Sequence, residues 1–196
     1  MMIKSLKPIY KTILAGDGGV GKTSLLKSKL AGKFTPEEKL TIGIDFDCYN
    51  IVSEPKDVSI LVYDLGGQER FQFIHKAFIL GAKAAIILYD LTRISTLYHI
   101  PSWISLLQTE YPSIPILIVG SKKDLVNDDM LRTNISEWEV LKETLPKSAN
   151  IIGHMTISAK HEKDCIDVFG EIKKLAIKWK EQSNVNNSGG IKTKQL

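Results

Sequence analysis

Short apolar runs alternate with segments of helical periodicity along most of the chain. Continuous or alternating apolar positions predict strands at 9–15, 45–52, 58–63, 84–89, 114–119 and 151–157. Apolar residues at helical spacing predict helices at 22–30, around 97–111, from Ser136 onward and across 166–179. Strands that alternate with helices are typical of a parallel sheet flanked by helices.

Local signals refine this pattern at three places. The polar connector at 53–57 is short and contains Pro55, so the strands on either side of it are predicted to pair antiparallel. Ser136 and Glu139 have the spacing of a capping box, which predicts that a helix begins there. After Glu181 the chain turns polar, so we expect an extension at 1–8, one domain at 9–180 and a flexible tail at 181–196.

The composition is that of one sizeable globular domain: of 196 residues, 43% are hydrophobic and 24% are charged. The formal net charge of +4 is spread thinly along the chain, which argues against a nucleic-acid-binding face. No apolar run approaches the ~18 residues of a membrane span. Cys48 and Cys165 lack metal-ligand spacing, so we expect free thiols in a reducing, cytoplasmic setting.

The segment from Gly16 to Thr23 has the spacing of a phosphate-binding loop. It reads Gly-Asp-Gly-Gly-Val-Gly-Lys-Thr and lies between a predicted strand and a predicted helix. Its glycines let backbone N–H groups turn inward around phosphates, and the helix adds its positive N-terminal end. We expect Lys22 to neutralise the β- and γ-phosphates and the Thr23 hydroxyl to hold Mg²⁺.

A second segment, Asp64-Leu65-Gly66-Gly67-Gln68-Glu69-Arg70, directly follows an apolar strand. Asp64 at the strand end is expected to reach the Mg²⁺ through water. The glycines allow a backbone N–H to approach a terminal phosphate. Gln68 can orient a water for in-line attack, because its amide both donates and accepts hydrogen bonds.

The segment Ser121-Lys122-Lys123-Asp124 carries chemistry that discriminates between bases. The Asp124 carboxylate can accept two hydrogen bonds from the N1–H and N2–H₂ edge of guanine, whereas adenine presents a lone pair at N1. Two weaker signals are Thr41 and the run Ser158-Ala159-Lys160. All five segments lie at strand ends or in the loops that follow, which is where doubly wound sheets bind ligands.

In this order the motifs resemble those of the Ras superfamily of small GTPases, and most of all the Rab branch. The resemblance covers about Ile9 to Trp179. Its Rab-like details are Thr41-Ile42-Gly43-Ile44-Asp45-Phe46, Gln68-Glu69-Arg70-Phe71, and Leu88-Tyr89-Asp90-Leu91-Thr92-Arg93 ahead of Trp103. The resemblance implies an α/β fold, the small G domain of the P-loop NTPases. This fold has a six-stranded, mostly parallel sheet with one antiparallel strand and five flanking helices.

The resemblance also implies two nucleotide-sensitive segments, switch I around Thr41 and switch II over about 64–80. The Thr41 hydroxyl would ligate Mg²⁺, and the N–H groups of Thr41 and Gly67 would meet the γ-phosphate. Phe34 would pack edge-on against guanine, Lys122 would cover the base and ribose, and the Ala159 N–H would bond guanine O6.

The expected site residues fall into four groups. The catalytic residues are Lys22, Gly67 and Gln68. The metal ligands are Thr23, Thr41 and, through water, Asp64. The nucleotide-binding residues are Asp17, Gly18, Gly19, Val20, Gly21, Lys22, Thr23, Ser24, Phe34, Thr41, Gly67, Ser121, Lys122, Asp124, Ser158, Ala159 and Lys160. The fourth group is a patch that faces effector proteins, formed by Phe46, Tyr63 and Phe78.

The sequence departs from the family pattern at three places. Ser121 stands where the family usually has Asn, so an amide's paired donor and acceptor are replaced by a hydroxyl. Gly66 replaces the commoner Ala, which makes switch II more permissive. The C-terminal run Ile191-Lys192-Thr193-Lys194-Gln195-Leu196 has no cysteine to prenylate, and residue 2 is Met. We therefore expect no lipid anchor, and any membrane contact to be peripheral and mediated by a partner.

The leading hypothesis is a switch that binds GTP or GDP with Mg²⁺ and hydrolyses GTP slowly alone and faster with an activating partner. No phosphate-loop arginine is placed to act in cis, so an arginine finger is expected from that partner. An exchange factor and effectors are the other expected partners. Two alternatives stay open: a nucleotide-loaded binding scaffold with negligible hydrolysis, against which Gln68 argues, and an ATP-dependent kinase, against which Asp124 argues.

Overall fold

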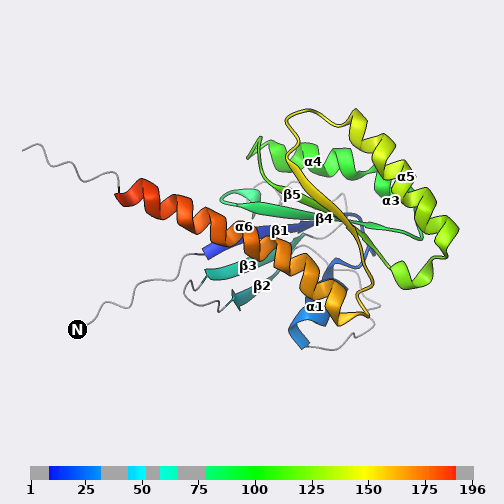
Figure 1. Cartoon of the computed structure of the whole chain (residues 1–196), viewed down its shortest axis with the longest axis horizontal. Coiled ribbons are helices and arrows are strands. Elements are labelled where there is room, and N and C mark those ends of the chain that lie inside the picture. The colour runs from blue at the N-terminus through cyan, green and yellow to red at the C-terminus, as the bar shows by residue number, and fades with distance from the viewer. Residues whose placement is uncertain (1–8, 32–43, 52–57, 66–77, 189–196) are drawn as a thin grey trace, which may run out of the picture.

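The computed structural model describes residues 9–31, 44–51, 58–65 and 78–188, and within them it shows one six-stranded sheet (Figure 1). The strands are β1 (Ile9–Ala15), β2 (Ile44–Ile51), β3 (Val58–Leu65), β4 (Ala84–Asp90), β5 (Ile116–Ser121) and β6 (Ile151–Thr156). Their order across the sheet is β2-β3-β1-β4-β5-β6. The prediction of an α/β fold with this six-stranded sheet is confirmed.

The sheet is parallel except at β2. β2 and β3 pair antiparallel, with Ile44 opposite Leu65 and Ile51 opposite Val58, so the predicted hairpin is confirmed. The pairs β1–β3, β1–β4, β4–β5 and β5–β6 are parallel. The carboxyl ends of β1, β3, β4, β5 and β6 therefore meet along one side of the sheet, which we call the carboxyl edge.

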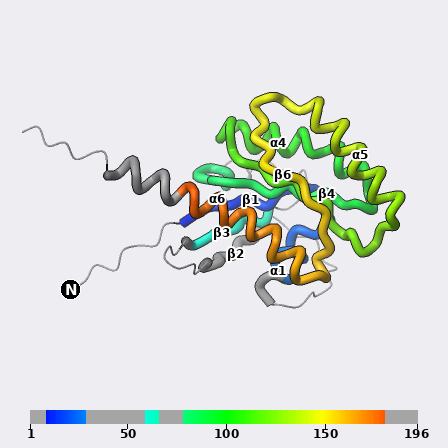
Figure 2. Tube along the Cα trace, viewed as in Figure 1, coloured from blue at the N-terminus to red at the C-terminus, as the bar shows by residue number. Residues whose placement is uncertain are grey.

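Helices cover both faces of the sheet in the described part of the chain. They are α1 (Lys22–Ala31), α3 (Ser95–Tyr98), α4 (Ile100–Gln108), α5 (Asp128–Thr144) and α6 (Glu162–Ser188), with a 3₁₀ turn η2 (Lys123–Leu125). In Figures 1 and 2, α1 and α6 lie on one side of the sheet and α4 and α5 on the other. The core divides in the same way, because alternate residues of a strand face opposite sides.

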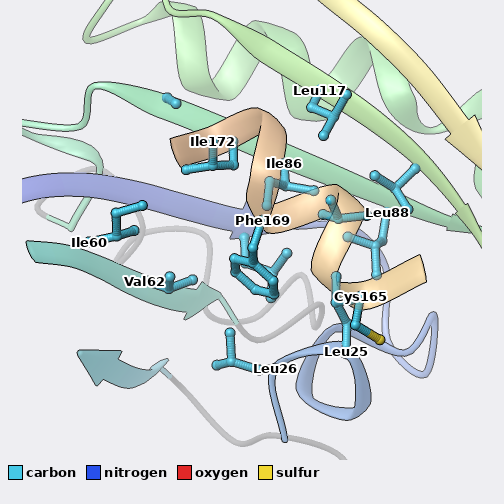
Figure 3. Close-up of a cluster of buried hydrophobic side chains, with 14 of the residues drawn as sticks. Leu25, Leu26, Ile60, Val62, Ile86, Leu88, Leu117, Cys165, Phe169 and Ile172 are labelled. Atoms are coloured by element: carbon cyan, nitrogen blue, oxygen red, sulfur yellow. The ribbon is translucent and has the colours of Figure 1, made fainter. Parts of the chain in front are cut away.

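The two halves of the core are built from neighbouring positions of the same strands. Leu14 packs in the cluster under α1 and α6, whereas Ile13 packs in the cluster under α4 and α5. Figure 3 shows Phe169 of α6 pointing toward the sheet, between Leu88 and Ile60. All seven residues of β4 are buried, as expected for a central strand with helices on both faces.

Helix α5 begins eight residues earlier than predicted. Its N-cap is Asn127, whose side-chain oxygen accepts a hydrogen bond from the Met130 N–H at 2.9 Å. Ser136 is an exposed residue inside the helix, so the prediction that a capping box starts the helix there is wrong. The first turns were missed because Asp128, Asp129 and most of their neighbours face solvent and lack an apolar stripe.

The predicted helix at 97–111 is two helices, α3 and α4, which meet at His99. Pro101 lies in the first turn of α4. Proline has no N–H to donate to the preceding turn, so α3 cannot continue through this position.

Strand β5 begins at Ile116 rather than at the predicted residue 114, and it ends at Ser121. Its shifted end places the Ser121 side chain at the carboxyl edge.

Helix α6 continues to Ser188, seven residues past the predicted start of the tail at 181. Residues 181–188 contain no Gly or Pro, and each added helical residue gains one backbone hydrogen bond. Residues 189–196 of the predicted tail, and the extension at 1–8, lie outside the described residues. Of the two cysteines, Cys165 is buried and is not part of a disulfide. None of the helices that the structure describes combines the length and apolarity needed to cross a membrane.

Three aromatic rings stack where β4, β6 and α5 meet. The His154 ring lies 5.9 Å from the Tyr89 ring and 5.1 Å from the Trp138 ring, and His154 Nε2 is 3.0 Å from the Tyr89 hydroxyl. Gly120 makes room for this stack, since a Cβ there would lie 2.8 Å from the Tyr89 hydroxyl. Burial lowers the pKa of His154 to about 4.

We predict that Asn127→Ala lowers the free energy of unfolding by about 1 kcal/mol, because the Met130 N–H loses its acceptor. The matched control is Ser136→Ala, at the position of the predicted cap. This change removes a hydroxyl from a helix interior and should leave stability unchanged or slightly raised. Urea unfolding of the two variants checks the assignment, and a larger loss in the Ser136 variant would contradict it.

We predict that the wild-type protein loses stability between about pH 6.5 and pH 4 because of His154. The folded-state pKa lies below the value of an unfolded chain, so the unfolded state binds the proton first as the pH falls. A His154→Gln variant keeps an acceptor for the Tyr89 hydroxyl but does not titrate. Between pH 7 and pH 5 the wild type should lose on the order of 2 kcal/mol more free energy of unfolding than this variant. Equal losses in urea unfolding would exclude His154 as the source.

Candidate functional site

The loop from Gly16 to Gly21 joins β1 to α1 at the carboxyl edge, and its glycines have backbone conformations that other residues rarely adopt. Gly16, Gly19 and Gly21 have φ values of +134°, +73° and +96°. A Cβ on Gly16 would lie 2.2 Å from the Leu88 carbonyl oxygen of β4. Only glycine fits at position 16. The loop can therefore run this close to β4 only because its sequence begins with a glycine.

Lys22 places its ammonium inside this loop. The residue begins α1 and is 5% exposed, and its Nζ donates to the carbonyl oxygens of Gly16 at 2.7 Å and Asp17 at 2.9 Å. Burial lowers the pKa of Lys22 to about 8, although the charges of Asp64 and Asp17 act to raise it. A buried cation at a helix N-terminus, within a loop of backbone amides, is suited to binding phosphate.

Thr23 and Asp64 form a pair of oxygen ligands next to the loop. The Thr23 hydroxyl donates to Asp64 Oδ2 at 2.5 Å, and Asp64 at the end of β3 is fully buried. A hydroxyl and a carboxylate are hard oxygen donors, and Mg²⁺ binds through one or two such groups with phosphate and water oxygens. The two residues therefore fit the metal role that the sequence predicted for them.

The predicted base-binding residues also meet at the carboxyl edge. Asp124 Oδ1 accepts from the Ser158 hydroxyl at 2.6 Å, and Oδ2 pairs with Lys160 Nζ at 2.7 Å. Burial acts to raise the pKa of Asp124, but the hydrogen bonds from Lys160 and Ser158 outweigh this effect. The pKa therefore falls below its usual value. Asp124 is therefore an ionised acceptor held in place by the segment that follows β6. Ala159 is tied to α1 by its carbonyl oxygen, which accepts from the Ser28 hydroxyl at 2.6 Å.

Ser121 joins the base-binding segment to the phosphate loop despite its departure from the family pattern. Its Oγ lies 2.5 Å from the Val20 carbonyl oxygen and 2.9 Å from the Tyr89 carbonyl oxygen. The hydroxyl has one proton, so it donates to one of these carbonyls at a time. The link between the base-binding segment and the phosphate loop, which an Asn amide would supply, is thus kept in part by the smaller Ser121 side chain, which is itself buried.

Two further residues hold the phosphate loop from outside, and the sequence analysis missed them. Asp17 Oδ1 accepts from Trp103 Nε1 at 2.9 Å, and Asp17 Oδ2 lies 2.5 Å from His99 Nδ1. The side chain of Asp17 is therefore directed to α4 and its N-cap. Trp103 was noted only as part of the resemblance, and no local pattern relates residue 103 to residue 17.

Asp90 is a third residue that the sequence analysis left without a role. It is fully buried at the end of β4, where it contacts Lys122 and Arg93. A signal for it existed, because Asp90 ends an apolar strand just as Asp64 does.

The predicted effector patch is described only in part. Tyr63 lies opposite Phe46 in the β2–β3 pairing, and its ring is 5.9 Å from the ring of Phe78. Lys11 Nζ lies 4.3 Å from the centre of the Tyr63 ring. Tyr63 and Phe78 are half-buried, packed beside the core under α4 and α5. The Phe46 side chain, and Phe34, Thr41, Gly67 and Gln68, lie outside the described residues, so their roles stay predictions.

Comparison with known proteins agrees with this geometry. The model of the Ras family matches residues 11–178. Ras-related protein RABA4a of Arabidopsis thaliana is 28% identical over 190 residues, which cover 96% of this chain and 84% of the relative. Ras-related protein Rab-19 of Homo sapiens is 36% identical over 169 residues, covering 82% of this chain and 72% of the relative.

A third relative matches a shorter stretch. GTP-binding protein ypt3 of Schizosaccharomyces pombe is 39% identical over 120 residues, which cover 61% of this chain and 56% of the relative. The matched family residues include the phosphate loop, Asp64, Asp124 and the Ser158–Lys160 segment. The chain therefore belongs to the Ras family of small GTPases and is similar to the Rab proteins within it.

Proposed function

We propose that this protein is a Rab-like molecular switch that binds GTP with Mg²⁺, hydrolyses it to GDP and phosphate, and presents different surfaces in the two states. The observation that carries the proposal is the position of Asp124. Its carboxylate is oriented by Ser158 and Lys160 on the same sheet edge as the Lys22 loop. One end of the site thus suits phosphates and the other suits guanine.

Binding would divide between the two ends of the carboxyl edge. Lys22 and the loop amides from Asp17 to Ser24 would hold the phosphates, and Thr23 and Asp64 would hold Mg²⁺, which neutralises charge on the phosphate oxygens. Asp124 would accept from the N1–H and N2–H₂ groups of guanine. The carbonyl of Ala159 is fixed by Ser28, which supports the role of the Ala159 N–H as a donor to guanine O6.

Hydrolysis would rest on positioning rather than on covalent chemistry. The residues proposed for it are Gln68, to orient the attacking water, and Gly67 and Thr41, to meet the γ-phosphate. Arg93 reaches the phosphate loop, but its guanidinium donates to the Gly18 carbonyl and the Asp90 carboxylate. We therefore assign the arginine finger to an activating partner, and we expect an exchange factor and effectors as further partners.

The protein would act in the cytoplasm, in keeping with buried Cys165, which is not part of a disulfide. The Phe46, Tyr63 and Phe78 patch is the surface we propose for effectors. Half-buried aromatic residues beside nucleotide-sensitive segments can anchor a partner.

We predict that Asp124→Asn weakens GTP binding and improves binding of xanthosine triphosphate. An amide can donate to the 2-oxo group of xanthine, whereas it cannot accept from both guanine donors. Each mismatched hydrogen bond to the base should change affinity by about tenfold or more. Competition of the two nucleotides against a fluorescent GDP analogue measures the preference. Asp129→Asn on exposed α5 is the control, and an unchanged preference in the Asp124 variant would remove Asp124 from the base site.

We predict that Gln68→Leu leaves GTP affinity unchanged and lowers single-turnover hydrolysis by about tenfold or more, because the group that orients water is lost. Measuring phosphate release with and without a candidate activating protein separates a switch from the alternative, a scaffold with negligible hydrolysis. Wild-type protein that binds GTP tightly but releases no phosphate under either condition would favour the scaffold. Equal rates in wild type and variant would assign the catalytic role to another residue.

A further inference from the structure

Asp90 and Asp64 are the fully buried carboxylates among the residues whose side chains the structure describes, and all acceptor positions of Asp90 are used. Oδ1 accepts from the N–H of Thr92 at 2.9 Å and from its hydroxyl at 2.7 Å. Oδ2 accepts from Arg93 Nε at 2.9 Å and from Lys122 Nζ at 2.7 Å. The Oδ1 bonds are local and shape the turn after β4. The Oδ2 bonds involve Arg93, which also bonds the phosphate loop, and Lys122, which belongs to the base-binding segment.

The Arg93 side chain connects Asp90 to the phosphate loop. While Nε donates to Asp90, Nη2 donates to the Gly18 carbonyl oxygen at 2.9 Å. The planar guanidinium fixes the directions of both bonds together. The peptide between Gly18 and Gly19 is thereby oriented, and in a trans peptide the Gly19 N–H points away from Arg93.

The Lys122 side chain connects Asp90 to the base-binding segment. Asp90 lies opposite Ser121 in the β4–β5 pairing, so the next residue is within reach of the carboxylate. Lys122 has φ +61°, the left-handed conformation that is unusual for a side chain of this size. Its ammonium is held by Asp90, which leaves the aliphatic stem as the part that can lie along a ligand.

The charges favour an ionised Asp90. Burial raises the pKa of the Asp90 carboxyl, but hydrogen bonds from Lys122, Thr92 and Arg93 lower it below its usual value. One carboxylate then faces two cations, so the cluster keeps a net positive charge beside the loop proposed to hold phosphates.

We propose that Asp90 is a positioning residue for nucleotide retention: through one carboxylate oxygen it holds Lys122 of the base-binding segment and, by way of Arg93, the Gly18 carbonyl of the phosphate loop. This inference rests on the proposed guanine-nucleotide site. It gives the Tyr89–Arg93 segment a role in nucleotide retention that does not depend on direct contact with the nucleotide. Loss of the cluster should loosen both ends of the site and speed nucleotide release.

Arg93 offers the sharpest test because its side chain is 45% exposed, whereas that of Asp90 is fully buried, so a substitution at Arg93 should disturb the fold less. Arg93→Gln should release a fluorescent GDP analogue about tenfold faster, a change that corresponds to about 1.4 kcal/mol. Its thermal midpoint without nucleotide should stay at the wild-type value. Arg93→Lys keeps the charge but not the two-pronged geometry, so its release rate should fall between those of wild type and Arg93→Gln.

Asp90→Asn should release the analogue at least as fast as Arg93→Gln. In the double variant the two effects should not multiply, because both substitutions break the same link. The matched control is Glu171→Gln, which changes a carboxylate that pairs with Lys174 at 2.6 Å on α6, away from this cluster. It should release the analogue at the wild-type rate.

Release from Arg93→Gln within twofold of wild type would overturn the proposal, even if Asp90→Asn fails to fold. Rates that multiply in the double variant, or an Arg93→Lys rate equal to that of Arg93→Gln, would overturn it as well. These outcomes leave the proposed function standing. Wild-type protein that does not bind the GDP analogue would instead remove the proposed function, and this inference with it.

Discussion

The contact between the Gly16 backbone and β4 is the constraint on which the phosphate loop depends. The chain leaves β1 beside Leu88, with no room for a Cβ at Gly16. Since β1 and β4 are neighbours in the sheet, the loop must turn at that point, and it turns over Lys22. The buried ammonium in turn bonds the carbonyls of Gly16 and Asp17. The position of the Lys22 ammonium, the cation proposed to bind phosphate, thus follows from the packing of two adjacent strands.

Charge along the carboxyl edge is organised by carboxylates that face fixed donors. Asp64 accepts from Thr23, Asp90 from Lys122 and Arg93, and Asp124 from Ser158 and Lys160. Such pairing offsets the cost of burying a carboxylate, and it keeps Asp90 and Asp124 ionised. The same pairing separates the proposed chemical tasks, because Lys22 and the proposed metal ligands lie at one end of the edge and the proposed hydrogen-bond acceptor for a base lies at the other.

The elements that sequence reasoning misplaced share a physical cause. The first turns of α5 are polar on nearly every side, so the apolar period by which helices are detected is absent there. Asn127 is as good a cap as Ser136, and the tertiary structure shows that the buried face of the helix includes Asn134, ahead of Ser136, as well as Trp138. The division of α3 from α4 was readable from Pro101, whose missing N–H is a local property.

The sequence alone was sufficient for the parallel sheet with its antiparallel hairpin and for the family, and it singled out the Gly16–Thr23 loop, Asp64 and Asp124, which the structure brings to the carboxyl edge. These features depend on local spacing of glycines, on apolar runs and on residues that directly follow them. The tertiary structure alone decided that Trp103 bonds Asp17, that Ser158 and Lys160 orient Asp124, and that Asp90 joins Lys122 to Arg93. Most of these partners lie 32 to 86 residues apart. They meet because the order of the strands brings five carboxyl ends to one edge, and the register of those strands is set by packing across the whole sheet.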